Sequence, residues 1–232
     1  MQLFYFKSSE NNFAFFDEEE TRHILVLRKQ IGDQINCTDG KGNLYKCELV
    51  EVSKKKVNAT IIELVAVQQH KSVVHIAIAP TKNIDRIEWF LEKATEIGLA
   101  AVTPILCKRS ERTKIRLDRL DNILLSAMKQ SLQYLKPKLS DLTDFQHFIK
   151  NISSETIKLI AYCNDDNVAA IKDVYTIGKP VVILIGPEGD FTPEEVKAAF
   201  AAGFVGVTLG PTRLRTETAG LMACMELAYL NR

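Results

Sequence analysis

Two glycine-bearing loops in the last quarter of the chain carry the residues best suited to hold a ligand. They are residues 185–191 (IGPEGDF) and residues 209–219 (LGPTRLRTETA). Glycine lets bare backbone approach a ligand closely or adopt positive φ, so both loops can bind through main-chain groups. Glu188 and Asp190 place two carboxylates at a helix entrance, where a phosphate would otherwise bind. The loops therefore favour a neutral or cationic ligand over a polyphosphate.

Other common ligand motifs are missing from the sequence. Neither a dinucleotide-binding fingerprint after a strand nor a phosphate-binding P-loop occurs. The five cysteines are scattered and never form C-x-x-C, and the four histidines show no ligand spacing. We therefore expect buried thiols, no disulfides and no metal site.

The sequence around each loop predicts a strand before it and a helix after it. The apolar runs Val181–Ile185 and Phe204–Leu209 are typical of buried strands. Residues 192–195 (TPEE) form a capping box with proline at the first helical position, and Gly203 ends that helix. Both loops are thus expected at the carboxyl ends of neighbouring strands, where open α/β sheets bind ligands.

The chain from residue 73 onward alternates between strand and helix patterns. This alternation predicts an α/β fold, a parallel, doubly wound sheet covered on both faces. The further strands are expected at residues 73–79, 101–107 and 157–162, and the further helices at residues 85–97, 117–132 and 217–230.

Residues 1–69 are predicted to form a small β domain. Residues 39–42 (DGKG) lie between alternating segments and are a strong hairpin signal. Lys54–Lys56 interrupt a later β-branched region and predict a turn or a charged sheet edge. The polar residues 68–72 are the expected linker, so the predicted domains are residues 1–69 and 70–232.

Composition and charge narrow the class of protein. With 46% hydrophobic and 25% charged residues the chain is ordinary for a globular protein. No apolar run approaches the roughly 20 residues of a membrane span, and the start of the chain is not a signal peptide, so we expect a cytoplasmic protein without membrane contact. The net charge is +1, but residues 108–119 hold six basic and two acidic residues. That window suits either phosphate contacts or a solvated face.

The two loops, read as GPEGDF and LGPTRLRTETAG, resemble the C-terminal signatures of the SPOUT class of RNA methyltransferases. They are most similar to the bacterial family that methylates N3 of a uridine in 16S ribosomal RNA. Asp190 departs from the family pattern in replacing a second glycine, and Thr212 stands where an arginine is common. The resemblance implies that S-adenosylmethionine binds in a C-terminal trefoil knot. The residues that it implies as contacts of S-adenosylmethionine are Leu184, Ile185, Gly186, Pro187, Glu188, Gly189, Leu209, Gly210, Leu214, Thr216, Thr218 and Ala219.

The resemblance extends over nearly the whole chain. The N-terminal residues look like the family's PUA-like RNA-binding barrel, with matches at His23, Leu27 and Arg28. Gln133 departs from the pattern at a position that is often arginine. The resemblance implies a homodimer that buries the terminal helix, and 16S ribosomal RNA or the small ribosomal subunit as the partner. The implied RNA contacts are Arg28, Lys82, Arg86, Arg109 and Arg112.

Methylation at N3 of uracil requires a proton to leave as the methyl group arrives. A guanidinium can stabilise the negative charge that develops on a uracil oxygen, and Arg215 is the first candidate, followed by Arg213. Glu217 is a candidate proton acceptor, although a carboxylate at a helix N-terminus is often structural. Two alternatives stay open. One is a non-catalytic RNA-binding assembly factor, and the other is a small-molecule α/β enzyme whose basic window is only surface.

Overall fold

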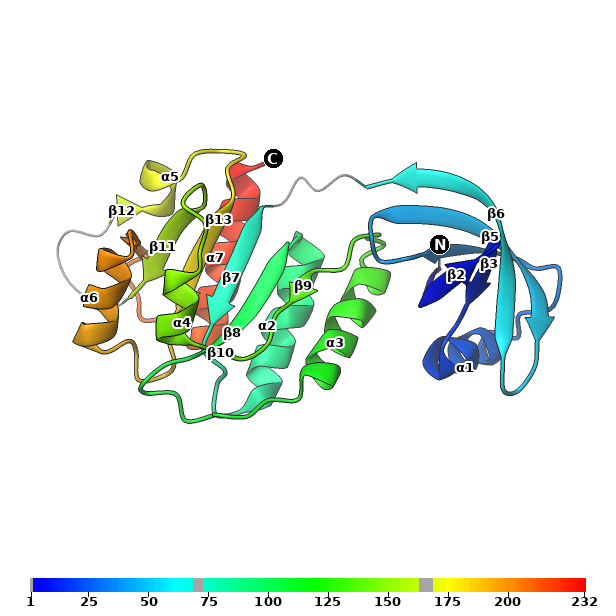
Figure 1. The fold of residues 1–232 in the computed structure, drawn as a ribbon, viewed down its shortest axis with the longest axis horizontal. Coiled ribbons are helices and arrows are strands. Elements are labelled where there is room, and N and C mark those ends of the chain that lie inside the picture. Colours follow the sequence, from blue (N-terminus) through cyan, green and yellow to red (C-terminus); the bar gives the residue numbers. More distant parts are fainter. Residues whose placement is uncertain (1, 69–72, 163–168) are drawn as a thin grey trace. The chain divides into compact units, whose positions relative to one another are not determined.

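The computed structural model describes residues 2–68, 73–162 and 169–232 (Figure 1). The chain divides into two compact units. The N-terminal unit combines Met1–His70 with Leu125–Lys136, and the C-terminal unit combines Lys71–Leu124 with Pro137–Arg232. The predicted linker at residues 69–72 lies outside the described residues.

The N-terminal unit is built on a six-stranded sheet with the order β1-β4-β5-β6-β3-β2. Its strands pair antiparallel, except that β1 pairs parallel with β4. The predicted hairpin is confirmed, because Gly40 and Gly42 have positive φ in the turn between β4 and β5. Lys54–Lys56 form the next turn. The strands are β1 (Leu3–Tyr5), β2 (Ser8–Glu10), β3 (Phe13–Phe15), β4 (Gln34–Thr38), β5 (Asn43–Val52) and β6 (Val57–Val67).

A helix in the N-terminal unit was not predicted. Helix α1 (Glu18–Val26) begins after Asp17, whose carboxylate accepts the Glu20 N–H at 2.9 Å. Ile24 from this helix is fully buried in the unit's core. Glu20 is buried as well and forms an ion pair with Lys129. Asp17–Glu20 are four successive acidic residues, and they cap and begin this helix.

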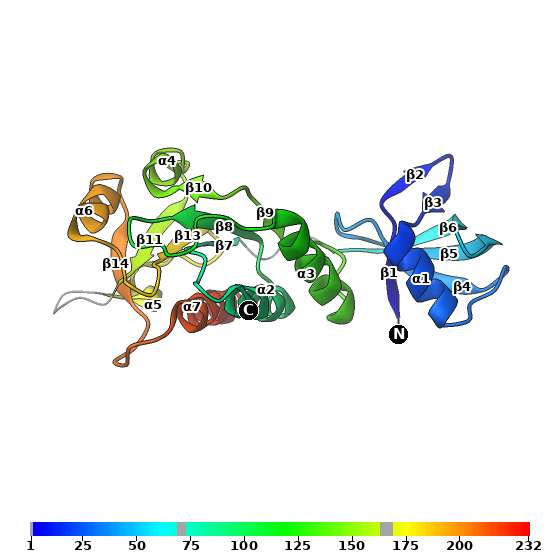
Figure 2. The ribbon, with the colours of Figure 1, turned by 90° about the horizontal axis from the view of Figure 1, so that it is seen from below.

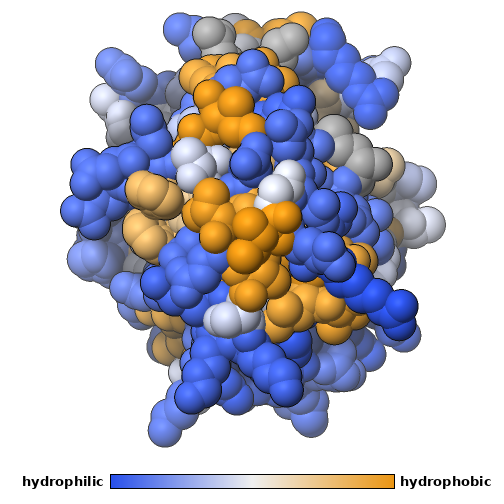
Figure 3. Space-filling view, turned by 90° about the vertical axis from the view of Figure 1, so that its right-hand side faces the viewer, coloured by the Kyte–Doolittle hydropathy of each residue, from blue (hydrophilic) through white to orange (hydrophobic). Residues whose placement is uncertain are grey.

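The second half of β6 is apolar on both sides of the sheet. Figure 3 shows one face of the molecule, on which apolar side chains gather in a strip among hydrophilic ones. The exposed large hydrophobic residues of this unit's strands are Phe13, Val50, Ile62, Leu64, Val65 and Val67. This unit thus offers aliphatic side chains to its surroundings as well as to its own core.

The C-terminal unit contains the predicted parallel sheet. Its strands follow the order β10-β8-β7-β13-β11-β14-β12, with β9 beside β8, and every pairing is parallel. The strands are β7 (Val74–Ile78), β8 (Ala101–Leu106), β9 (Lys138–Leu139), β10 (Thr143–Asp144), β11 (Ile157–Ala161), β12 (Ala169–Ala170), β13 (Val181–Ile185) and β14 (Val205–Thr208).

Helices cover both faces of this sheet, as predicted. Figure 2 shows α2 and α7 on one side and α4 and α6 on the other. Gly220 lets α7 lie close to the sheet, since a Cβ there would stand 2.8 Å from Cδ1 of Ile78 and 2.9 Å from Cε2 of Phe90. The helices are α2 (Ile84–Ile97), α3 (Leu117–Gln130), α4 (Phe145–Lys150), α5 (Ile171–Val174), α6 (Pro193–Ala201) and α7 (Thr216–Leu230). The residues of α3 from Leu125 onward belong to the N-terminal unit.

The sheet order corrects one prediction. The two glycine-bearing loops follow β13 and β14, but these strands are not neighbours, because β11 pairs with both of them. An earlier part of the chain thus lies between two later strands, an arrangement that local sequence patterns do not reveal.

Cysteines, metal ligands and membrane spans can be judged only for the described residues. Cys37, Cys47, Cys107 and Cys224 are buried and free, whereas Cys163 lies outside the described ranges. Burial raises the pKa of the Cys224 thiol to about 12. Within residues 2–68, 73–162 and 169–232 no group of three or more potential ligands could hold a metal ion. No helix in the same ranges is both long and apolar enough to cross a membrane.

Candidate functional site

A pocket of about 1110 Å³ opens at the carboxyl edge of the parallel sheet. Its walls are the loop after β13, the loop after β14 and the end of β11, with Arg109 from the segment after β8. The volume is large enough for a nucleoside-sized ligand. The lining residues are Arg109, Ala161, Tyr162, Ile185–Asp190, Val207–Thr216 and Ala219.

Most of the residues that were predicted to bind S-adenosylmethionine line this pocket. The exceptions are Leu184, which is fully buried within β13, and Thr218, which is exposed on α7. The two glycine-bearing loops contribute most of the lining residues. Contact of these residues with S-adenosylmethionine stays a prediction.

The loop after β13 is held in shape by its own acidic residues. Oε1 of Glu188 accepts the Lys82 N–H at 2.9 Å, while its Oε2 is buried and has no hydrogen-bond partner in the part of the chain that the structure describes. Asp190 has φ of +60°, and its Oδ1 accepts the Phe191 N–H at 2.7 Å. A Cβ on Gly186 would lie 3.3 Å from that same Oδ1. Asp190 therefore adopts positive φ without being a glycine, and its carboxylate packs against Gly186.

The loop after β14 depends on a glycine for its backbone conformation. Gly210 has φ of +118°, which side-chain-bearing residues rarely adopt. Its N–H donates to Oγ1 of Thr208 at 3.2 Å, and the Thr208 hydroxyl donates to the Gly210 carbonyl at 3.2 Å. Apart from Gly210 and its two chain neighbours, no heavy atom of the described residues lies within 4 Å of a Cβ built at this position. Conformation rather than space therefore requires glycine at this position.

Two of the three predicted catalytic residues line the pocket, and the third does not. Arg213 and Arg215 are exposed and line the pocket. Glu217 is buried, is absent from the lining, and has its Oε1 3.8 Å from Nε of Arg86. This ion pair links the start of α7 to α2, while Oε2 of Glu217 is buried without a hydrogen-bond partner among the described residues.

The predicted RNA contacts of the C-terminal unit already contact the chain itself. Arg109 donates to the Gly189 carbonyl at 2.7 Å, and Arg112 donates to the carbonyls of Thr81 at 3.0 Å and Lys82 at 2.6 Å. Nζ of Lys82 lies 2.9 Å from Glu111, which raises the lysine pKa. Arg86 pairs with Glu217, and Arg28 is exposed in the N-terminal unit. Two arginines of the basic window thus support loops, a role that the sequence did not indicate.

Sequence analysis missed two residues that line the pocket and one hydrogen bond between neighbouring loops. Ala161 and Tyr162 line the pocket because β11 lies between β13 and β14. Glu195 is buried and accepts both the Thr192 N–H and the Lys108 N–H at 2.8 Å. The capping box revealed the first of these bonds. No sequence signal indicated the second, which ties α6 to the segment after β8.

Known proteins resemble this chain over both units. Residues 68–228 match a family described as an RNA methyltransferase domain, and residues 16–62 match an RNA methyltransferase PUA domain. Ribosomal RNA small subunit methyltransferase E of Bacillus subtilis is 33% identical over 91% of this chain and 88% of its own length.

Two solved structures are similar in fold as well as in sequence. A probable rRNA-methyltransferase from Porphyromonas gingivalis has a TM-score of 0.92 and 39% identity, and the match covers 100% of this chain and 98% of that one. A ribosomal RNA small subunit methyltransferase E from Neisseria gonorrhoeae, bound to S-adenosyl methionine, has a TM-score of 0.89 and 28% identity over 99% and 98% of the two chains.

Proposed function

This chain belongs to the RNA methyltransferase family, and from that membership and its pocket we propose that it methylates N3 of a uridine in 16S ribosomal RNA. The donor is S-adenosylmethionine. The observation that carries the proposal is the pocket itself, which two glycine-bearing loops form at the carboxyl edge of the sheet. The PUA domain adds a second RNA-binding unit.

The residues of the pocket fit S-adenosylmethionine chemically. The donor has no phosphates and carries positive charge on its sulfonium and amino groups. The buried Oε2 of Glu188 is an acceptor that lacks a partner among the described residues, and its negative charge suits a cationic ligand. Gly186 and Gly210 bring main chain to the pocket surface without side chains. When bound, S-adenosylmethionine supplies an electrophilic methyl group.

The exposed arginines are placed to assist the transfer. Arg215 and Arg213 line the pocket, so either guanidinium can stabilise negative charge on a uracil oxygen as N3 loses its proton. Holding the base edge toward the donor removes much of the entropic barrier. Because Glu217 is buried against Arg86, we assign it to the support of α7 and assign the N3 proton to solvent water.

RNA binding involves both units of the chain in this proposal. Arg28 is exposed in the PUA-like unit, and the Lys82 side chain is 76% exposed beside the pocket edge. Either cation can contact RNA phosphates. The small ribosomal subunit is the assigned partner and the cytoplasm the assigned compartment, since the substrate is ribosomal.

The outer face of α7 supports a homodimer. A helix that is apolar on all sides normally lies in a protein core. In α7 the inner side chains, such as Leu227, are buried, yet Met222, Met225 and Tyr229 are 42%, 50% and 70% exposed. A second copy of the chain would cover this stripe. The trefoil knot is also part of the proposal, supported by β11 lying between β13 and β14.

A methyl-transfer assay tests the proposed function. Small ribosomal subunits that lack the modification are incubated with the protein and S-adenosylmethionine labelled in its methyl group. We expect label in 16S ribosomal RNA and N3-methyluridine after digestion. Donor binding without any transfer to the subunit or to free 16S RNA would instead indicate a non-catalytic assembly factor.

A further inference from the structure

Three loops at the carboxyl edge of the sheet are tied together by side chains that the transfer chemistry does not use. We name them by the strands that they follow. The β7 loop is residues 79–83, the β8 loop is residues 107–116, and the β13 loop is residues 186–192. The β13 loop lines the pocket, whereas the β7 loop does not.

Arg112 of the β8 loop holds the β7 loop by a forked contact. Its Nε lies 3.0 Å from the Thr81 carbonyl oxygen, and its Nη2 lies 2.6 Å from that of Lys82. A guanidinium donates in fixed directions, so two bonds to successive carbonyls fix the orientation of that backbone. On the other side, the Lys82 N–H donates to Glu188 of the β13 loop at 2.9 Å. The β7 loop thus connects Arg112 to a pocket residue.

Arg109 holds the β13 loop directly. Its Nη1 donates to the Gly189 carbonyl at 2.7 Å. The stem of the arginine also packs on this glycine, because a Cβ at Gly189 would lie 3.3 Å from both Cβ and Cδ of Arg109. The backbone of the β8 loop adds a third tie, since the Lys108 N–H donates to the buried Glu195 at 2.8 Å.

We propose that Arg112 and Arg109 are positioning residues for the methyl donor, because they fix the β7 and β13 loops that set the orientation of Glu188 in the pocket. The inference rests on the proposed function only in naming S-adenosylmethionine as the ligand. Arg112 is outside the pocket lining, so it acts through the β7 loop. A loop held in its binding conformation before the ligand arrives loses less entropy on binding.

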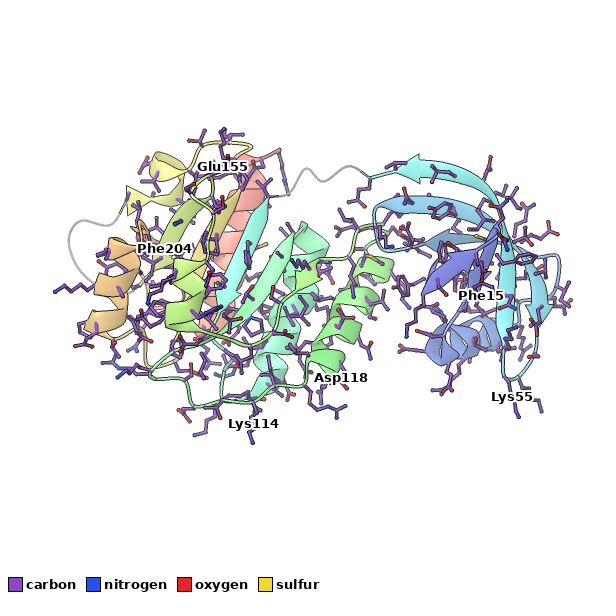
Figure 4. The ribbon with its side chains drawn as sticks, in the orientation of Figure 1. Phe15, Lys55, Lys114, Asp118, Glu155 and Phe204 are labelled. Atoms are coloured by element: carbon purple, nitrogen blue, oxygen red, sulfur yellow. The ribbon has the colours of Figure 1, made fainter. Side chains whose placement is uncertain are left out.

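The test compares donor affinity between Arg112 and a matched arginine nearby. Calorimetry with S-adenosylmethionine is performed on the wild type, on Arg112→Ala and Arg112→Lys, and on Arg116→Ala. Arg116 belongs to the same loop, but its side chain is 77% exposed and pairs with Asp118 at 2.8 Å. Figure 4 shows Asp118 and the neighbouring Lys114 projecting outward. Arg116→Ala therefore removes the same charge without touching the β7 loop.

We expect Arg112→Ala to bind the donor about tenfold more weakly, as two charge-assisted hydrogen bonds at a partly exposed position are lost. Arg112→Lys should recover only part of the affinity, because an ammonium cannot reproduce the fork. In the transfer assay the KM for the donor should rise while kcat at saturating donor stays near the wild-type value. Arg116→Ala should bind the donor like the wild type.

Donor affinity in Arg112→Ala equal to that of a wild type that does bind would overturn the inference. If that variant also binds RNA more weakly, with a salt slope reduced by about one, Arg112 is a phosphate contact instead. If Arg112→Ala melts far below the wild type, Arg112→Lys replaces it, since this variant keeps the charge and most of the stem but not the fork, and its donor affinity should still fall below that of the wild type. Failure of the wild type to bind S-adenosylmethionine would refute the proposed function instead.

Discussion

Replacing Gly210 by alanine separates backbone conformation from ligand binding. Gly210 has φ of +118° in the pocket, and Gly203 has φ of +87° at the end of α6, outside the pocket lining. A Cβ at either position would meet no heavy atom of the described residues within 4 Å, apart from the glycine and its two chain neighbours. The two substitutions therefore impose the same kind of strain, in a pocket loop and in a helix terminus.

The expected loss of folding stability follows from the backbone strain alone. An alanine forced into sparsely populated positive-φ backbone costs about 1–3 kcal/mol, so urea unfolding should show a loss of this size for either variant, or less where the loop relaxes. Relaxation of the loop at position 210 moves main-chain groups at the pocket. We expect Gly210→Ala to bind S-adenosylmethionine at least about tenfold more weakly, a loss of about 1.4 kcal/mol. Gly203→Ala should bind it like the wild type.

Calorimetry on the folded proteins decides between the possible outcomes. Wild-type donor affinity in Gly210→Ala, together with the expected loss of stability, would refute the view that this loop binds through its backbone. Equal loss of donor affinity in both variants would show that general destabilisation, rather than the pocket loop, controls binding.

Burial of His75, close packing of Gly220 and exposure of Met225 each have a measurable consequence. His75 bonds Thr103 at 2.8 Å, and its burial lowers the histidine pKa from 6.5 to about 4. Between pH 6.5 and about 4 only the unfolded chain binds this proton, so the free energy of unfolding should fall by about 2 kcal/mol from pH 7 to pH 5. In urea titrations the His75→Gln variant should lose that part of the pH dependence. Gly220→Ala should cost about 1–3 kcal/mol in the same titrations, since its Cβ would stand 2.8 Å from Ile78; a loss below about 0.5 kcal/mol would contradict tight packing of α7. Met225→Lys should convert a dimer into a monomer in light scattering without lowering donor affinity, and a monomeric wild type would remove the dimer from the proposal.

Local signals in the sequence predicted much of the C-terminal unit. Residues 181–185 form a strand with the expected bounds, and the capping box of Thr192 and Glu195 begins α6. Each of these elements is specified by its own few residues, through an apolar run or a reciprocal hydrogen bond. The pocket residues were found for the same reason, because glycine loops after buried strands mark the carboxyl edge of a sheet.

What the sequence could not predict depends on contacts between distant segments. The position of β11 between β13 and β14 brought Tyr162 to the pocket, and no local pattern specifies strand order. Helix α1 carries its own start signal at Asp17, but Ile24 is its one buried apolar side chain, so the sequence shows little apolar periodicity there. The charge of residues 108–119 indicated phosphate contacts, whereas Arg109 and Arg112 donate to carbonyls at least 30 residues away in the sequence, which charge alone could not show.

We propose that this protein places a methyl group on N3 of a uridine in 16S ribosomal RNA. Nucleoside mass spectrometry of 16S RNA, from cells with and without the gene for this chain, tests it most directly. We predict that N3-methyluridine disappears in cells without the gene and returns when the wild-type protein is supplied. An unchanged level of N3-methyluridine in those cells, or the loss of a different methylated nucleoside, would contradict the claim.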